Sequence, residues 1–191
     1  MSIDKKKERL AEIILERSFK YSDNPPFTLA SGRQSNYYFN CKPTTLDPEG
    51  MNLIGTIVFD MVKGYDITAA GGLTLGADPI ANALALISYQ KGKPIKSFIV
   101  RKDVKAHGTK SAVEGNVATG EKVLIIDDVI TTGGSTITAI EQARGAGLIV
   151  ERVITLIDRE EGGRENILKH VGHVESVFTR TEIMALRAKT K

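Results

Sequence analysis

The stretch VLIIDDVITTGGSTITAI, from Val123 to Ile140, decides the fold class. Its four leading apolar residues predict a buried strand that ends at Asp127 and Asp128, and a helix is predicted to begin at Ser135. In open α/β sheets, ligands bind at the carboxyl ends of the strands. The sequence therefore places two acids and a turn of small residues where a ligand is expected.

The turn itself has the composition of a phosphate site. Backbone N–H groups at the glycines, hydroxyl donors and the partial positive charge of a helix start all favour an anion. The carboxylates would repel a phosphate, but they suit the hydroxyl groups of an adjoining ribose. The alternative is that the acids only end a strand and the glycines only turn the chain. The predicted ribose 5-phosphate contacts are Asp127, Asp128, Thr131, Thr132, Gly133, Gly134 and Ser135.

Outward from this stretch, apolar strands alternate with helices along the chain. This alternation predicts an α/β fold with a parallel sheet of about five strands and helices on both faces. We expect one domain over 1–191, with a small N-terminal hood over about 1–45. The other strands are predicted at 67–70, 95–100, 150–157 and 174–178, the hood strands at 27–30 and 36–40, and the helices at 4–19, 48–63, 78–89, 135–146 and 164–170.

Composition excludes several classes of protein. The net charge is only +3 and no long basic stripe interleaved with aromatics occurs, so no nucleic-acid partner is expected. No run of about 18 apolar residues occurs, so no membrane span is expected. The single cysteine, Cys41, fits a cytoplasmic location; we interpret it as a bystander, with a catalytic thiol as the alternative. The sequence lacks G-x-x-x-x-G-K-[ST] and G-x-G-x-x-G, which argues against ATPase and dinucleotide sites.

A second signal is the basic segment IVRKDVKAHGTKSAVEG, from 99 to 115. Its cations crowd between two predicted strands, with glycines at 108 and 115 as flexible points. Such a flap would stabilise the charge that develops on a departing diphosphate and would exclude water. The alternative is an exposed charged loop without function. The basic residues of the segment are Arg101, Lys102, Lys105, His107 and Lys110.

These two segments resemble those of a known enzyme class. The acid pair followed by T-T-G-G-S is similar to the ribose-phosphate signature of type I phosphoribosyltransferases. R-K-x-x-K-x-H-G resembles the catalytic loop of the orotate-specific members, in which the loop contacts diphosphate in the neighbouring subunit's site. The resemblance assigns the diphosphate to Arg101, Lys102, Lys105 and His107. The resemblance implies a homodimer with shared active sites. It also implies catalytic roles for Lys105, His107, Asp127 and Asp128.

Two further segments carry the resemblance to the orotate-specific family. F-T-L-A-S-G-R-x-S-x-Y-Y-F, from 27 to 39, looks like its hood, and D-R-E-E-G-G, from 158 to 163, resembles its Asp-Arg segment. Many members have lysine where this chain has Ala30 and Leu75. The alternative for the arginine of D-R-E-E-G-G is a surface ion pair with Glu160 or Glu161. The resemblance assigns orotate to Thr131, Arg159, Tyr38 and Phe39.

The expected reaction joins orotate to 5-phosphoribosyl 1-diphosphate and yields orotidine 5′-monophosphate and diphosphate, in pyrimidine biosynthesis. Mg²⁺ is the expected cofactor, held by substrate and water rather than by direct protein ligands. One alternative is a phosphoribosyltransferase for another base, and another is a ligand-sensing regulator without catalysis. His170 and His173 are spaced as a metal pair, but no acid cluster accompanies them, so we interpret them as exposed residues.

Overall fold

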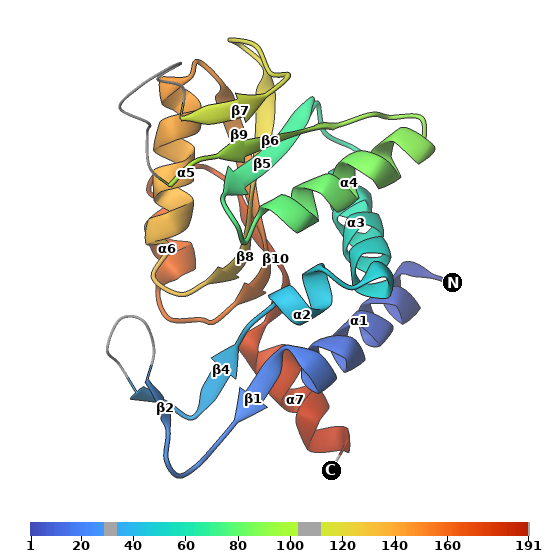
Figure 1. The fold of residues 1–191 in the computed structure, drawn as a ribbon, viewed down its shortest axis with the longest axis vertical. Helices are drawn as coiled ribbons and strands as arrows, with labels where there is room; N and C mark the ends of the chain where they lie inside the picture. Colours follow the sequence, from blue (N-terminus) through green and yellow to red (C-terminus); the bar gives the residue numbers. More distant parts are fainter. Residues whose placement is uncertain (29–33, 103–111, 191) are drawn as a thin grey trace.

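The computed structural model describes residues 1–28, 34–102 and 112–190, and its centre is a six-stranded sheet (Figure 1). All neighbouring strands are parallel except β6 and β7, so the predicted parallel sheet is confirmed, with an antiparallel edge strand added. The strand order is β10 (Val174–Thr179), β9 (Ile149–Asp158), β8 (Lys122–Ile130), β5 (Ala69–Leu73), β6 (Lys96–Val100) and β7 (Val113–Gly115).

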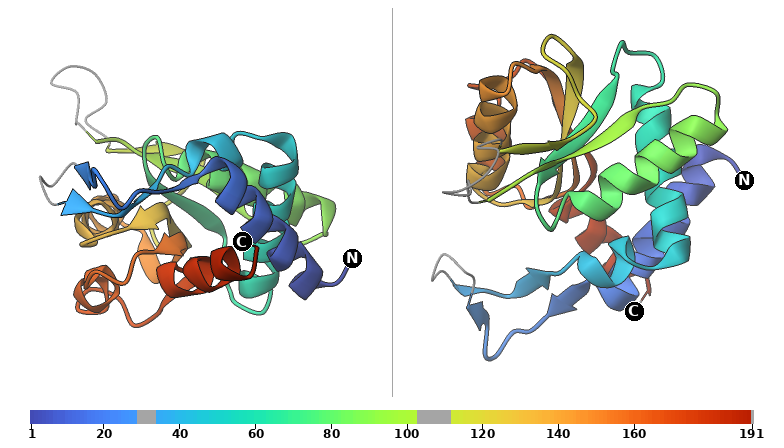
Figure 2. Two further views of the ribbon diagram at one scale, coloured as in Figure 1. Left: turned by 90° about the horizontal axis from the view of Figure 1, so that it is seen from below. Right: turned by 45° about the horizontal axis from the view of Figure 1, so that its top comes forward.

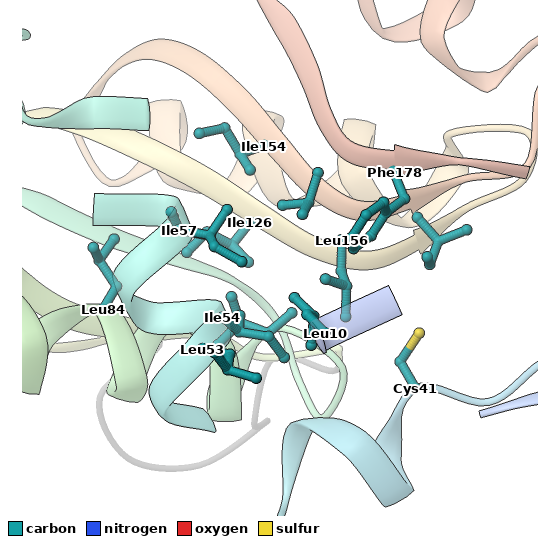
Figure 3. Close-up of a cluster of buried hydrophobic side chains, with 14 of the residues drawn as sticks. Leu10, Cys41, Leu53, Ile54, Ile57, Leu84, Ile126, Ile154, Leu156 and Phe178 are labelled. Atoms are coloured by element: carbon teal, nitrogen blue, oxygen red, sulfur yellow. The ribbon is translucent and has the colours of Figure 1, made fainter. Parts of the chain in front are cut away.

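Helices cover both faces of the sheet, as predicted (Figure 1). On one face lie α1 (Ile3–Arg17), α3 (Pro48–Val62) and α4 (Asp78–Gln90); on the other lie α5 (Gly134–Gly145) and α6 (Gly163–Ile167). Each face has its own apolar cluster, and residues of β8 alternate between them. Leu124 and Ile126 join the α1, α3 and α4 side, which Figure 3 shows, whereas Val123 and Ile125 join the α5 side. Burial on both faces explains the continuous apolar run.

The N-terminal hood extends away from the sheet (Figure 2). Its elements are β1 (Phe19–Tyr21), which pairs with β4 (Tyr37–Phe39), β2 (Phe27–Thr28), which pairs with β3 (Gln34–Ser35), and the short helix α2 (Lys42–Thr45). The first helix was predicted to continue to residue 19, but it ends at Arg17 because Phe19 pairs with Phe39 across β1 and β4, with ring centroids 5.0 Å apart.

Two strands differ from their predicted bounds at the edge where the site lies. β5 was predicted to end before Gly71, yet Gly71 and Gly72 lie inside it. A side chain does not fit at these positions, because a Cβ on Gly71 would lie 2.2 Å from the carbonyl oxygen of Phe98. β8 continues beyond the two acids because its pairing with β9 extends to Ile130, opposite Asp158. Asp127 and Asp128 therefore lie within the strand.

Three other features complete the fold. Helix α7 (Arg180–Thr190), which was not predicted, contacts α1. Cys41 is fully buried in the cluster of Figure 3, and this burial raises the pKa of its thiol well above the usual value, in keeping with a bystander. None of the described helices is both long and apolar enough to cross a membrane.

Candidate active site

The turn after β8 ends in an open helix N-terminus. Gly133 has a φ of +87°, in the left-handed region, and a Cβ there would lie 2.9 Å from the carbonyl oxygen of Gly163. Helix α5 begins at Gly134 without a side-chain cap, and Thr132, Gly134 and Ser135 are exposed. Because the first N–H groups of a helix have no partners within the helix, this turn presents donors to an anion.

Asp127 is held by two donors. Its Oδ1 accepts from the backbone N–H of Asp128 at 2.9 Å, and its Oδ2 accepts from the hydroxyl of Thr136 at 2.5 Å. Burial raises the pKa of Asp127 to about 7; the hydrogen bond from Thr136 opposes this shift, and the charge of Asp128 adds to it. Asp127 therefore changes charge near neutral pH.

Asp128 lies against the loop that follows β5. Its Oδ1 accepts from the backbone N–H of Val129 at 3.0 Å. A Cβ on Gly76 would lie only 2.5 Å from that Oδ1 and 2.8 Å from Cγ of Asp128. Gly76 is therefore a glycine because a side chain there would collide with Asp128.

The same loop carries Leu75, at a position where lysine is common among the proteins that this chain resembles. Leu75 is 70% exposed, and its peptide bond with Thr74 is cis. The hydroxyl of Thr74 donates to Oδ2 of Asp78 at 2.8 Å, which ties the loop to the start of α4. A pocket of about 330 Å³ lies against the loop, lined by Lys42, Leu46, Met51, Leu75, Asp78, Pro79 and Asn82.

Arg159 follows β9 and is only 5% exposed. Its Nη2 lies 2.7 Å from Oε1 of Glu161 and 3.5 Å from the hydroxyl of Ser35, and its guanidinium lies 5.2 Å from the ring of Tyr37. The Nε atom is buried and has no hydrogen-bond partner among the described residues. The ion pair between Arg159 and Glu161, which was the alternative role for Arg159, is thus present, although it lies in the interior rather than on the surface.

The aromatic residues of the hood differ in exposure and in their neighbours. Tyr38 is 39% exposed and its ring lies 5.8 Å from that of Phe27. Phe39 is 6% exposed and belongs to the core cluster. Tyr37 lies beside Arg159, and its hydroxyl accepts from Nη1 of Arg180 at 2.7 Å. Tyr37 and Arg180 were missed because no local pattern marks them.

The basic segment leaves the sheet at the end of β6. Arg101 pairs with Glu114 across the β6–β7 hairpin at 2.9 Å, its backbone N–H donates to Ala112, and Lys102 is exposed. The structure thus brings Arg101 and Lys102 to the edge where β5 and β8 end. Lys105 and His107 lie outside the described residues, as does Ala30.

No group of three or more His, Cys, Asp and Glu side chains is placed to hold a metal within 1–28, 34–102 and 112–190. His173 is exposed and His170 is half-buried, and they form no such group. The acids at the edge of the sheet offer oxygen atoms only, which are the ligands that Mg²⁺ accepts.

Comparison with known proteins defines the class. No family model matches the chain. The orotate phosphoribosyltransferase of Mycobacterium tuberculosis in complex with Fe(III) dicitrate has a TM-score of 0.80 at 36% identity, covering 93% of this chain and 98% of that chain. Its complex with 5-phospho-alpha-D-ribosyl 1-diphosphate has a TM-score of 0.76 at 34% identity, with the same coverage. Fold and site together define a type I phosphoribosyltransferase.

Comparison of sequences identifies a more specific family than comparison of structures does. The orotate phosphoribosyltransferase of Aquifex aeolicus is 47% identical over 178 residues, which cover 93% of this chain and 97% of the relative. The chain therefore belongs to the orotate phosphoribosyltransferase family.

Proposed function

We propose that the protein transfers the 5-phosphoribosyl group from 5-phosphoribosyl 1-diphosphate to orotate, yielding orotidine 5′-monophosphate and diphosphate in pyrimidine synthesis. The observation that carries the proposal is the pairing of Asp127 and Asp128 with the exposed, uncapped start of α5. Anion donors and hydroxyl acceptors lie side by side there, as a ribose 5-phosphate requires.

The 5-phosphate binds the turn from Thr131 to Ser135. Its oxygens accept from the backbone N–H groups of Gly134 and Ser135 and from the hydroxyls of Thr132 and Ser135, all on exposed residues. The carboxylates of Asp127 and Asp128 accept hydrogen bonds from the ribose hydroxyls. As the diphosphate leaves, the sugar carbon gains positive character, and these two carboxylates stabilise that charge.

Orotate carries a planar carboxylate, and Arg159 is the residue we assign to it. A guanidinium binds such a group through two parallel hydrogen bonds. The buried Nε without a partner, beside an Nη2 that already faces Glu161, supports a carboxylate-binding role for this edge of Arg159. Thr131 lies at the start of the turn, and Tyr38 and Phe39 lie in the hood; these three residues are the other proposed contacts with the base.

The leaving diphosphate is the proposed partner of the basic segment. Arg101 and Lys102 stand at the end of β6, and Lys105 and His107 follow them in the sequence. Cations fixed near developing charge lower the barrier to departure. We assign the main catalytic role to Lys105, on the basis of the family resemblance of its segment.

Magnesium is the proposed cofactor. The oxygen atoms of Asp127 and Asp128 fit a hard cation, and Asp127 already accepts from two protein donors, which favours contact through water and substrate oxygens. When bound with the diphosphate, the ion would neutralise part of the negative charge on the leaving group.

We also propose a homodimer in which Lys105 of one subunit serves the other subunit's site. Exposed apolar side chains lie just after α2, in the loop between β5 and α4, and on α4, and they support a surface for a second copy; these are Leu46, Leu75, Leu86 and Tyr89. A cytoplasmic location, the single domain and the lack of a nucleic-acid partner remain predictions.

A panel of bases tests the function. The protein is incubated with labelled 5-phosphoribosyl 1-diphosphate, Mg²⁺ and orotate, uracil, adenine or hypoxanthine, and diphosphate release is measured. We expect release with orotate far above that with the other bases. Release with a purine instead would support the alternative base, and tight binding of the sugar diphosphate without release would support a regulator.

A further inference from the structure

Thr136 lies one residue beyond the predicted phosphate turn, in the first turn of α5, and it is 1% exposed. Its buried hydroxyl lies 2.5 Å from Oδ2 of Asp127, on the neighbouring strand β8. A buried hydroxyl donor needs a partner, and here the partner is one of the two acids of the site.

The backbones on both sides of this hydrogen bond are fixed. Asp127 pairs with Thr155 of β9 in the register of the central sheet. Thr136 belongs to the helix whose uncapped first N–H groups form the proposed anion site. With Oδ1 of Asp127 held by the N–H of Asp128, the hydroxyl of Thr136 engages the second oxygen and fixes the plane of the carboxylate.

We propose that Thr136 is a positioning residue of this site, whose hydroxyl ties the carboxylate of Asp127 to the first turn of the phosphate-binding helix. The proposal rests on the proposed ribose-binding role of Asp127. Thr136 does not touch the substrate and acts through Asp127.

The surroundings of Asp127 disfavour its ionised form, so the hydrogen bond from Thr136 to that form affects its pKa. The titratable groups beside it are Asp128 on the same strand, whose negative charge opposes ionisation of Asp127, and the Cys41 thiol from the segment before α2, whose raised pKa keeps it neutral. Burial disfavours the carboxylate form as well. A hydrogen bond to the ionised form offsets these effects, so loss of the hydroxyl is expected to raise the pKa of Asp127 further.

The test compares Thr136→Val, which removes the hydroxyl at equal size, with Thr136→Ser, which keeps it. Thr56→Val on α3 is the matched control, because the Thr56 hydroxyl bonds only to the carbonyl of Asn52 within its own helix in the described structure. The pH profile of kcat/KM is measured between about pH 5 and 9 for all three variants and the wild type.

For Thr136→Val we expect the acid limb of kcat/KM to move to higher pH by about one unit, since a hydrogen bond to a charged group is worth about that shift. Thr136→Ser and Thr56→Val should keep the wild-type limb. If the Thr136→Val limb superimposes on that of Thr136→Ser, the proposal fails. Should Thr136→Val not fold, Thr136→Ala provides the same comparison with a smaller side chain.

A second measurement separates this proposal from the function itself. Carboxyl carbon resonances of the ligand-free protein are titrated by NMR, with Asp127→Asn identifying the signal of Asp127. A raised pKa in Thr136→Val supports the link even if orotate proves to be the wrong base. An unchanged pKa overturns the link, and wild-type protein without any transferase activity overturns the function instead.

Discussion

Gly76 and Asp128 lie so close that a Cβ on the glycine would stand 2.5 Å from Oδ1 of the carboxylate. A side chain at residue 76 must therefore displace one of the two acids at the edge of the sheet. The loop after β5 and the end of β8 form one surface, and the position of Asp128 depends on a residue 52 places earlier in the chain.

Gly76→Ala is expected to lower kcat/KM by about tenfold or more, because the shifted carboxylate no longer meets the ribose hydroxyls. Steady-state kinetics with both substrates measure the effect, and thermal unfolding checks the fold. Gly145→Ala on α5 is the control, since a Cβ there meets nothing within 4 Å. Equal activity of the two variants would show that the contact between Gly76 and Asp128 does not determine the position of the catalytic carboxylate.

Asp127→Asn tests the pH dependence of stability. The pKa of Asp127 in the folded protein is about 7, above its usual value of 3.8, so its contribution to stability is complete below about pH 4 and is lost as the pH rises through 7. The variant does not ionise. Relative to wild type, we expect the free energy of unfolding of the variant to increase by on the order of 1–3 kcal/mol as the pH rises from about 5 to 8. Denaturant unfolding at each pH measures the difference, and a constant difference would contradict the raised pKa.

Asp127→Asn combined with Asp128→Asn is expected to abolish most turnover while the protein stays folded. In the proposed reaction the two carboxylates stabilise the positive character of the sugar carbon, and amides do not carry that charge. Single-turnover kinetics measure the chemical step, and circular dichroism reports the fold. A wild-type value of kcat/KM in the double variant would show that neither residue takes part in the reaction.

Arg159→Ala is expected to raise the KM for orotate by about tenfold to a hundredfold, because a hydrogen bond to a charged group contributes roughly 1.5–3 kcal/mol. The KM for 5-phosphoribosyl 1-diphosphate should change far less. Arg164→Ala, on the adjoining helix α6 and exposed, serves as the control. A similar rise in both KM values would count against a base-binding role and in favour of a structural ion pair with Glu161.

Lys105→Ala is expected to lower kcat by on the order of a hundredfold, as loss of one stabiliser of developing charge does. Mixing these subunits with subunits that carry Asp127→Asn and Asp128→Asn tests the shared site. A heterodimer holds one site with both acids and an intact basic segment, so about half of normal activity per dimer should return. Persistent inactivity after verified subunit exchange would place the segment in its own chain's site.

The sequence by itself determined the fold class and the glycine turn that leads into α5. Four apolar residues before Asp127 and two glycines after Thr132 are local signals, because a strand, a left-handed turn and a helix start each depend on a few consecutive residues. The confirmed parallel sheet, with helices on both faces, rests on the same short-range patterns.

Only the tertiary structure decided which residues meet at the site. Ser35 and Arg159 are 124 residues apart, and no periodicity relates them. The contact of Gly76 with Asp128, the bond from Thr136 to Asp127 and the burial of Phe39 likewise follow from how strands, helices and hood pack. Strand and helix patterns fix which faces are buried, whereas the partner of each polar side chain depends on distances across the fold that those patterns do not encode.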